Sequence, residues 1–152
     1  MSTTYEPFSV ERIRDIIALG LQMHAESAYS DMPFDIETAA QSIYTNIIQG
    51  DAGFGVIAYK DDKPVGMMAG ALATQFFGPA VFAYDFVWYV TPEVRGSSTA
   101  VRMLKKFEAW ARSKGAKEIH LGVTTGVDPE KTHGIYERMG YTHVGNNYTL
   151  KL

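Results

Sequence analysis

One stretch of the sequence, residues 85–110, constrains the fold more than any other. It begins with an apolar, aromatic and β-branched run that stops at Pro92, which is typical of a buried strand. Hydroxyl side chains at residues 97–99 suit a helix N-cap, and the apolar residues that follow recur at helical spacing. A strand that turns directly into a helix leaves free N–H groups and the positive end of the helix dipole at one point. The stretch therefore predicts a phosphate site with the Arg95 guanidinium beside it, although it also fits an ordinary capped helix.

The order of the expected elements predicts an α/β fold. Hydrophobic spacing along the chain gives the order β-α-α-β-β-β-α-β-α-β-β, which builds a mixed sheet with helices on both faces. Asp35 is expected to cap the second helix and Gly50 to end it, while Gly115 and Gly140 end the two later helices. The expected strands cover residues 5–10, 53–59, 65–73, 80–90 and 117–123, and residues 141–144 and 148–152 are expected to form a closing hairpin. The expected helices start near residues 10, 36, 100 and 128.

Composition excludes several classes of protein. The chain has 152 residues, which suits a single domain (1–152), and its net charge of −3 gives no bulk attraction to nucleic acid. It contains no cysteine, which excludes disulfides and a thiol nucleophile, and its four histidines lack the spacing of a metal site. No apolar run approaches the roughly 20 residues of a membrane helix, and no signal peptide is visible. We therefore expect a cytoplasmic protein with no metal, no nucleic-acid partner and no membrane partner.

Residues 90–100 resemble the acyl-CoA-binding motif of the GNAT (Gcn5-related) N-acetyltransferase superfamily. Members carry Gln/Arg-x-x-Gly-x-Gly/Ala between the fourth strand and the third helix, after a lead-in of the form Val-x-Pro-Glu-x-Arg-Gly. The lead-in here is VTPEVRG at residues 90–96, and the motif is RGSSTA at residues 95–100, with Ser98 in the place of a glycine. The order of elements also resembles the GNAT order along nearly the whole chain. The resemblance implies a GNAT-like, mixed and mostly antiparallel sheet.

The resemblance also implies how acetyl-CoA binds as the acyl donor. In the family the motif holds the diphosphate, and the fourth strand splays from the fifth so that its unpaired backbone binds the pantetheine arm. A backbone N–H of that strand can also stabilise the oxyanion. Lys105, Lys106 and Arg112 form an exposed face of the third helix that either is simply solvated or touches the 3′-phosphate. The residues expected to bind acetyl-CoA are Trp88, Tyr89, Val90, Arg95, Gly96, Ser97, Ser98, Thr99 and Ala100.

A second segment, IYERMGY at residues 135–141, resembles the family's Leu-Tyr-x-x-x-Gly-Phe element. In the family this tyrosine donates a proton to the leaving thiolate, and a phenol with a pKa of about 10 is protonated at neutral pH. The resemblance thus makes Tyr136 the general acid; the alternative is a tyrosine that only packs against the sheet. The family often has an asparagine seven residues earlier, where this chain has Pro129. The hydrogen bond that this asparagine makes to the cofactor must then come from Asp128 or Thr132, or be absent.

Transfer to an amine also requires the neutral amine, because an alkylammonium with a pKa of about 10.4 must lose a proton to a base or through water before it attacks. Asp85 interrupts an apolar strand and is the first candidate, with a pKa raised by burial. Strand alternation predicts that its side chain faces away from Phe86, Trp88 and Val90. Glu26 is a weaker candidate, and for both carboxylates a salt-bridged or solvated role is an alternative. Aromatic residues that suit an acceptor pocket are Tyr29, Phe34, Phe76, Phe77 and Tyr84.

The function expected from these residues is N-acetyl transfer from acetyl-CoA to a primary amine by direct attack. No covalent enzyme intermediate is expected, because the chain has no cysteine nucleophile. The acceptor is a small-molecule or peptide amine, and a homodimer through edge strands is an open possibility. The alternative is a catalytically silent GNAT-fold module that binds CoA or a protein partner, which the departures at Ser98 and Pro129 favour.

Overall fold

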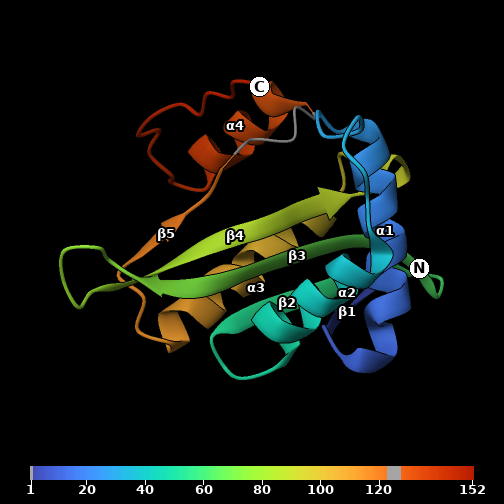
Figure 1. Cartoon of the computed structure of the whole chain (residues 1–152), viewed down its shortest axis with the longest axis horizontal. Coiled ribbons are helices and arrows are strands. Elements are labelled where there is room, and N and C mark those ends of the chain that lie inside the picture. Colours follow the sequence, from blue (N-terminus) through green and yellow to red (C-terminus); the bar gives the residue numbers. More distant parts are fainter. Residues whose placement is uncertain (1, 123–127) are drawn as a thin grey trace.

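The computed structural model describes residues 2–122 and 128–152. Its centre is a five-stranded sheet in the order β1-β2-β3-β4-β5, in which β1 to β4 are antiparallel neighbours and β5 is parallel to β4 (Figure 1). The strands are β1 Thr3–Pro7, β2 Gly53–Lys60, β3 Lys63–Thr74, β4 Val81–Val90 and β5 Glu118–His120. The helices are η1 Val10–Arg12, α1 Ile13–Glu26, α2 Ile36–Ile43, η2 Tyr44–Ile48, η3 Pro92–Val94, α3 Thr99–Ser113 and α4 Pro129–Arg138.

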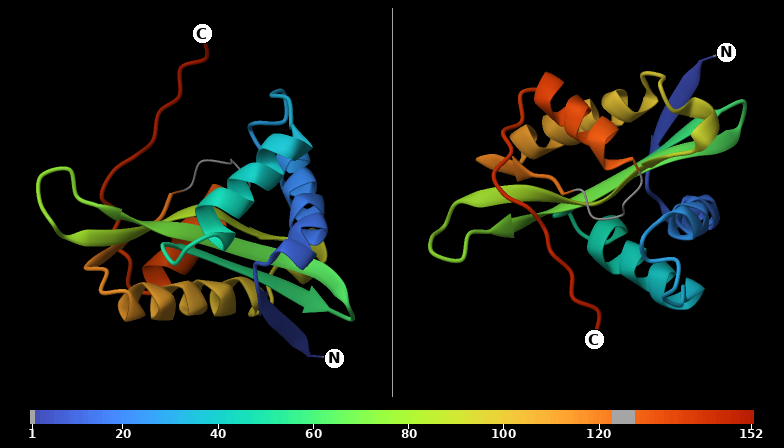
Figure 2. Two further views of the ribbon diagram at one scale, coloured as in Figure 1. Left: turned by 60° about the horizontal axis from the view of Figure 1, so that its bottom comes forward. Right: turned by 90° about the horizontal axis from the view of Figure 1, so that it is seen from above.

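Helices cover both faces of the sheet, so the expected α/β class with a mostly antiparallel sheet is confirmed (Figure 2). Helices α1 and α2 with η2 lie on one face, where Leu19 packs among the buried side chains of β2, β3 and β4. Helices α3 and α4 lie on the other face, where Phe107 is fully buried. Burial of these apolar side chains is the main force that holds the layers together. No helix among the described residues has the length and apolar character needed to span a membrane.

Glycine in β3 lets α3 approach the sheet closely. A Cβ atom built on Gly70 would lie 2.4 Å from the carbonyl oxygen of Tyr84 and 2.6 Å from the ring of Phe107. Neither a backbone oxygen nor the fully buried Phe107 ring can move away without cost. The glycine at this position is therefore a packing requirement of the α3 face.

A β-bulge interrupts β4 at Phe86. Ala69 of β3 pairs with Val87 and Gly70 pairs with Asp85, so Phe86 has no partner on β3. An extra residue reverses the alternation of side chains beyond it, so Ala83 and Trp88 both pack into the α3 core although they are five residues apart. The Asp85 side chain consequently shares the face of Trp88. Strict alternation predicted the opposite face, and that prediction is wrong because the bulge lies between the two residues.

Strands β4 and β5 diverge after a short paired segment. The two strands pair only from Phe82–Glu118 to Tyr84–His120, and the last six residues of β4, 85–90, have no β5 partner among the described residues. In the sequence, Glu118 to Leu121 alternates in the way a longer strand does, but β5 ends at His120. Val123, the expected end of this strand, lies outside the described residues.

The C-terminal hairpin expected at residues 141–144 and 148–152 does not form, because residues 141–152 contain no strand. Their side chains are largely exposed: Val144 is 94% and Tyr148 90% accessible, and Lys151 contacts Asp31 through an ion pair of 2.7 Å. Figure 2 shows this tail as an extended trace outside the sheet. A hairpin is marginal in water unless a sheet edge or face supports it, and this one has neither.

The N-terminal elements differ from the expected ones only in detail. The first strand ends at Pro7, and the helical turn η1 starts at Val10 and leads directly into α1. Asp35 caps α2 as predicted by accepting from the N–H of Glu37. Ile36, expected in the buried stripe of α2, is 54% exposed because it stands at the first position of the helix.

Candidate active site

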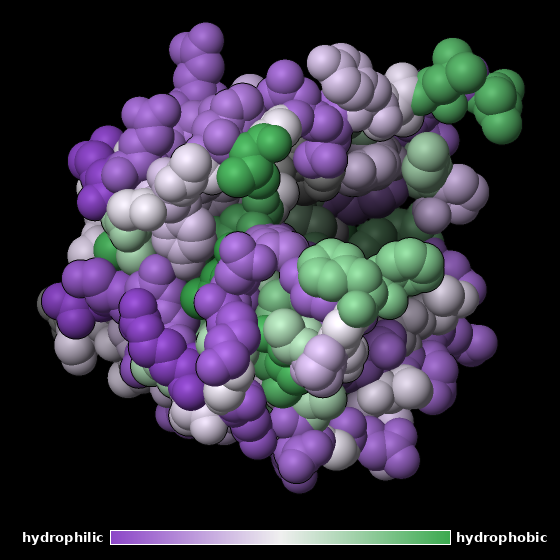
Figure 3. Space-filling view, turned by 90° about the vertical axis from the view of Figure 1, so that its left-hand side faces the viewer, coloured by the Kyte–Doolittle hydropathy of each residue, from purple (hydrophilic) through white to green (hydrophobic). Residues whose placement is uncertain are grey.

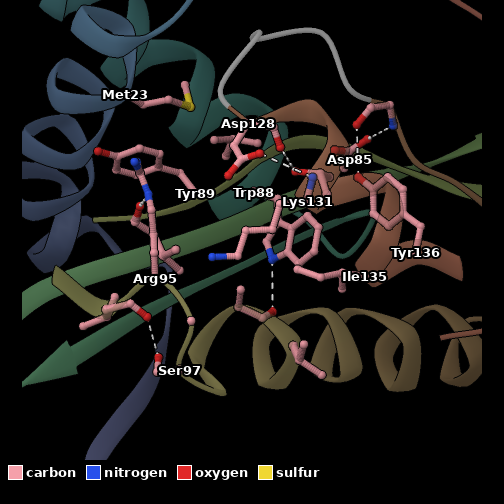
Figure 4. Close-up of a pocket in the computed structure, with 18 of the residues that line it drawn as sticks. Met23, Asp85, Trp88, Tyr89, Arg95, Ser97, Asp128, Lys131, Ile135 and Tyr136 are labelled. Carbon is pink, nitrogen blue, oxygen red and sulfur yellow. Dashed lines mark hydrogen bonds between the residues drawn. The ribbon is translucent and has the colours of Figure 1, made fainter. Parts of the chain in front are cut away.

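A cavity of about 250 Å³ opens where β4 leaves β5 (Figure 4). Its walls are the open half of β4, the loop that follows β4, the first turn of α3 and one side of α4. Met23 reaches it from α1, on the opposite face of the sheet from α3. The cavity thus connects the two faces through the gap between β4 and β5.

The loop before α3 presents backbone N–H groups to this cavity. Gly96 has a φ of +87°, a left-handed conformation that favours glycine, and it lines the cavity together with Ser97, Ala100 and Val101. Among the described residues, the amides of Gly96, Ser98, Ala100 and Val101 donate to no protein acceptor. Free amides at the positive end of a 15-residue helix form a site suited to phosphate.

Serine and threonine side chains fix the shape of this loop. The Ser97 hydroxyl donates to the carbonyl oxygen of Val94 at 2.6 Å and accepts from the N–H of Thr99 at 3.3 Å, so Ser97 is the side chain that caps α3. Thr99 is buried behind the loop. The Ser98 hydroxyl accepts from Nε of Arg102 at 3.1 Å, and Ser98 has an ordinary helical backbone conformation. Serine therefore fits the glycine position of the motif without strain.

Arg95 stands at the rim of the cavity with its guanidinium already bound. Its Nη2 lies 2.8 Å from Oε2 of Glu26, its Nε donates to the carbonyl oxygen of Val90 at 3.3 Å, and the group lies 5.7 Å from the centre of the Tyr89 ring. The Tyr89 hydroxyl donates to the same Glu26 oxygen. Burial first and the Glu26 carboxylate second raise the pKa of Tyr89. Glu26 thus joins the end of α1 to β4 and to the motif.

Trp88 connects β4 with two helices. Its indole N–H donates to the carbonyl oxygen of Ala100 at 3.0 Å, and its ring stacks on Tyr136 with centroids 5.5 Å apart and planes 17° apart. The backbone of β4 from Trp88 through Tyr89 to Val90 lies in the splayed half of the strand and lines the cavity. The Trp88 side chain therefore holds α3 and α4 in place around this open backbone.

Tyr136 and Asp85 meet at Gly122, and both line the cavity (Figure 4). The Tyr136 hydroxyl donates to the carbonyl oxygen of Gly122 at 3.0 Å, and the N–H of Gly122 donates to Oδ1 of Asp85 at 3.3 Å. Burial raises the pKa of Asp85 to about 6 against the opposing effect of the Gly122 N–H. Burial, and secondarily Asp85, raise the pKa of Tyr136. A protonated phenol and a weakly basic carboxylate thus share one wall.

Helix α4 forms the remaining wall. Asp128 caps it by accepting from the N–H of Lys131 at 3.4 Å, and the Thr132 hydroxyl donates to the Asp128 carbonyl oxygen at 3.2 Å. Asp128, Lys131, Thr132 and Arg138 all line the cavity. The spacing i, i+4 and i+7 of Lys131, Ile135 and Arg138 is a sequence signal that marks this face, although motif analysis missed it.

Comparison with known proteins identifies the family. Residues 21–141 match the profile of the acetyltransferase (GNAT) family, which is most of the chain. The chain belongs to the GNAT family. No curated protein sequence matches it significantly.

Solved structures of GNAT proteins share the fold. The aminoglycoside acetyltransferase AAC(6′)-Iy, in complex with a bisubstrate analogue of CoA, is 13% identical with a TM-score of 0.79 and covers 100% of this chain and 99% of its own. AAC(6′)-Ih from Acinetobacter baumannii is 17% identical with a TM-score of 0.77, covering 99% and 98%. A ribosomal-protein-alanine N-acetyltransferase from Brucella melitensis is 15% identical with a TM-score of 0.75, covering 100% of both chains.

Membership of the GNAT family makes this protein an N-acetyltransferase that uses acetyl-CoA. The residues expected to act fall into two groups around one cavity: those expected to bind acetyl-CoA, and the pair Tyr136 and Asp85, which is expected to move protons. Those of β4 and of the motif line it at Trp88, Tyr89, Val90, Arg95, Gly96, Ser97 and Ala100, whereas the exposed Ser98 and the buried Thr99 do not line it. The exposed basic residues of α3 expected near the 3′-phosphate, such as Lys106, do not line it, and Lys106 lies over the ring of Tyr5 instead. Among the described residues, no cluster of three His, Asp or Glu side chains is arranged as a metal site.

Proposed function

We propose that this chain acts as one domain, residues 1–152, that transfers the acetyl group of acetyl-CoA to a primary amine by direct attack. The observation that carries the proposal is a single cavity with two kinds of wall. Free N–H groups of the α3 N-terminus lie at one wall, and the pair of Tyr136 and Asp85 lies at another. The first suits the diphosphate of the donor, and the second suits proton transfer.

The motif residues supply donor binding. The amide N–H groups of Gly96, Ser98, Ala100 and Val101 donate to no protein acceptor among the described residues, so they are available to phosphate oxygens. Residues 88–90 of β4 offer backbone groups that a pantetheine arm can pair with as an added strand does. Lys131 and Arg138 of α4 add positive charge to the same cavity.

Two side chains are proposed to move protons. Asp85, with a pKa of about 6, is ionised at neutral pH and is a better base than an ordinary carboxylate, so it takes a proton from the attacking amine. The N–C bond forms as the C–S bond breaks, and Tyr136 donates its proton to the departing sulfur. The raised pKa of Tyr136 keeps this hydroxyl protonated throughout the physiological range. One proton leaves the amine and one reaches the thiol, so the charges balance.

The acceptor class is an amine on a small molecule or a peptide. The neighbouring structures are named as enzymes for aminoglycosides and for a ribosomal-protein alanine, and both kinds of acceptor carry an amine. The alternative of a silent module drew on Ser98 and Pro129. Ser98 has an unstrained backbone and its hydroxyl accepts from Arg102, and Pro129 occupies the first position of α4, where proline is favoured. A cytoplasmic location and a homodimer stay predictions from the sequence.

The proposal is tested by titration of the full chain with acetyl-CoA in a calorimeter, followed by a thiol-release assay over a panel of amines. We expect saturable binding and amine-dependent release of free thiol. Failure of acetyl-CoA to bind would contradict the assignment of the α3 N-terminus. Binding with thiol release that no amine accelerates would contradict direct attack by an amine.

A further inference from the structure

Aromatic rings form a ladder along the face of β4 opposite Asp85. Phe82 and Tyr84 have ring centroids 6.1 Å apart, and Tyr84 meets Phe86 edge-on at 5.2 Å. At the other end Phe82 stacks on His120 of β5 at 4.5 Å with planes 26° apart. None of these four residues belongs to either hydrophobic core cluster. The rings therefore pack on one another and leave surface free to contact another ring.

The ladder begins at the cavity. Phe86 is the unpaired residue of the bulge, it lines the cavity, and its side chain is 47% exposed. The residue before it, Asp85, is the proposed base on the other face of the strand. Figure 3 looks at the end of the molecule where the β3–β4 hairpin protrudes, and apolar side chains border a hollow there. A molecule whose amine enters the cavity from this side has its remaining part against the ladder.

The charges around the site match a molecule with one amine better than a polycation. A polycation needs several free carboxylates, but the described lining of the cavity has two carboxylates, Asp85 and Asp128, against three cations, Arg95, Lys131 and Arg138. Three other carboxylates already have side-chain partners. Glu26 binds Arg95 and Tyr89, Asp31 binds Lys151, and Glu118 lies 3.4 Å from His120. Aromatic faces, in contrast, attract other rings through offset and edge-on contacts.

We propose that the acceptor is a primary amine that carries an aromatic ring, and that Phe86 and Tyr84 bind this ring, with Phe82 packed behind Tyr84, while the amine points to Asp85. The proposal rests on the proposed function of the same cavity, and it narrows the acceptor from any amine to an aryl-alkylamine. Tyr84, which the sequence suggested for an acceptor pocket, is the central ring of the ladder. The sequence did not mark Phe82 and Phe86, because only the tertiary structure shows that Phe86 lines the cavity.

The experiment compares three acceptors with the full chain: 2-phenylethylamine, its saturated analogue 2-cyclohexylethylamine, and the polycation spermidine. We expect kcat/KM for phenylethylamine to exceed that for the saturated analogue about tenfold, on the scale of one aromatic contact. Tyr84→Leu and Phe86→Leu should remove this preference while the Kd of acetyl-CoA stays unchanged. The control is Tyr44→Leu, an exposed aromatic of η2 that does not line the cavity. A preference for spermidine, or a preference for phenylethylamine that survives both ladder variants, overturns the proposal.

A binding readout separates this proposal from the proposed function. Line broadening of phenylethylamine in NMR spectra, with CoA present, should occur with the wild-type chain and vanish with Tyr84→Leu. This result supports the ladder even where turnover of every amine is absent, an outcome that would contradict only the proposed function. Absence of broadening with the wild-type chain overturns the aromatic acceptor even where acetyl transfer to other amines is rapid.

Discussion

The two halves of β4 have similar apolar and aromatic sequences but different surroundings. Residues 82–84 have strand partners on both sides, from β3 and from β5, whereas residues 85–90, apart from the bulged Phe86, pair with β3 but with no described residue of β5. The paired half contributes Ala83 to the buried core, and the open half lines the cavity. A strand thus becomes a binding surface where its neighbour leaves, because its backbone groups then lack partners. Changes in the open half should cost activity, and changes at the buried core contacts of the paired half should cost stability.

The largest effect on activity is expected at Tyr136, whose ring stacks on Trp88 of the open half of β4. Tyr136→Phe should lower kcat by about 10²–10⁴-fold, the range of a general acid, with little change in the Kd of acetyl-CoA. Steady-state kinetics and calorimetry measure the two quantities. The matched control is Tyr141→Phe, which removes the hydroxyl that donates to Glu108 and should leave kcat unchanged. Equal turnover of the Tyr136→Phe and wild-type proteins would remove the acid role.

The next effect concerns the loop that follows the open half. Gly96→Val forces a β-branched residue into a φ of +87° beside the free amides, so the affinity for acetyl-CoA should fall by about 100-fold. Gly140→Val is the control, because Gly140 has a φ of +90° at the end of α4 and does not line the cavity. We expect both variants to lose stability in thermal melts and only Gly96→Val to lose affinity in calorimetry. A loss of affinity in both would show that unfolding is the cause.

The ionised Asp85 carboxylate is expected to lower the stability of the folded protein while it supports activity. Its folded pKa of about 6 lies above the ordinary value of 3.8, so its contribution to stability is full below about pH 4 and is lost as the pH rises through 6. Asp85→Asn should therefore raise the free energy of unfolding at pH 7 by about 2 kcal/mol and should lower kcat. The wild-type rate should rise with pH through about 6, and the variant should lack this limb.

Urea unfolding at pH 4 and pH 7 and a pH–rate profile measure these changes. The exposed Asp51, changed to Asn, is the control and should alter neither quantity. An Asp85→Asn protein that is less stable than the wild type at pH 7 would contradict the desolvation of this carboxyl group. If the Asp85→Asn protein kept the rise of the pH–rate profile through about pH 6, that rise would belong to another titrating group.

The smallest expected functional effect lies beside the paired half. Gly70→Ala places a methyl group against the carbonyl oxygen of Tyr84 and the ring of Phe107, and it should cost about 1–3 kcal/mol of unfolding free energy. The acetyl-CoA affinity of the folded fraction should stay within about twofold of the wild-type value, because the cavity lies beyond the bulge. Gly78→Ala, at a glycine with open space around it, is the stability control. A selective loss of affinity in Gly70→Ala would break the division between the two halves.

Local signals in the sequence predicted the helix starts and ends well. Asp35 caps α2, Pro129 starts α4, and Gly115 and Gly140 end helices with positive φ, all as expected. The strand, turn and helix around Gly96 also form as predicted. These features depend on neighbours within a few residues, so their residue types are sufficient to specify them.

The acceptor side depended on contacts that the sequence does not display. The bulge at Phe86 brings Trp88 onto the face of Asp85, and Glu26 reaches Arg95 from 69 positions away. The tail at residues 141–152 alternates as a strand does but meets no sheet edge. The sequence by itself determined the order of elements as far as α4, the helix ends at Gly115 and Gly140, and the strand, turn and helix around Gly96, because each depends on short-range geometry. Only the tertiary structure decided which side chains meet at the cavity, because strand register, a one-residue bulge and a strand edge depend on partners far along the chain.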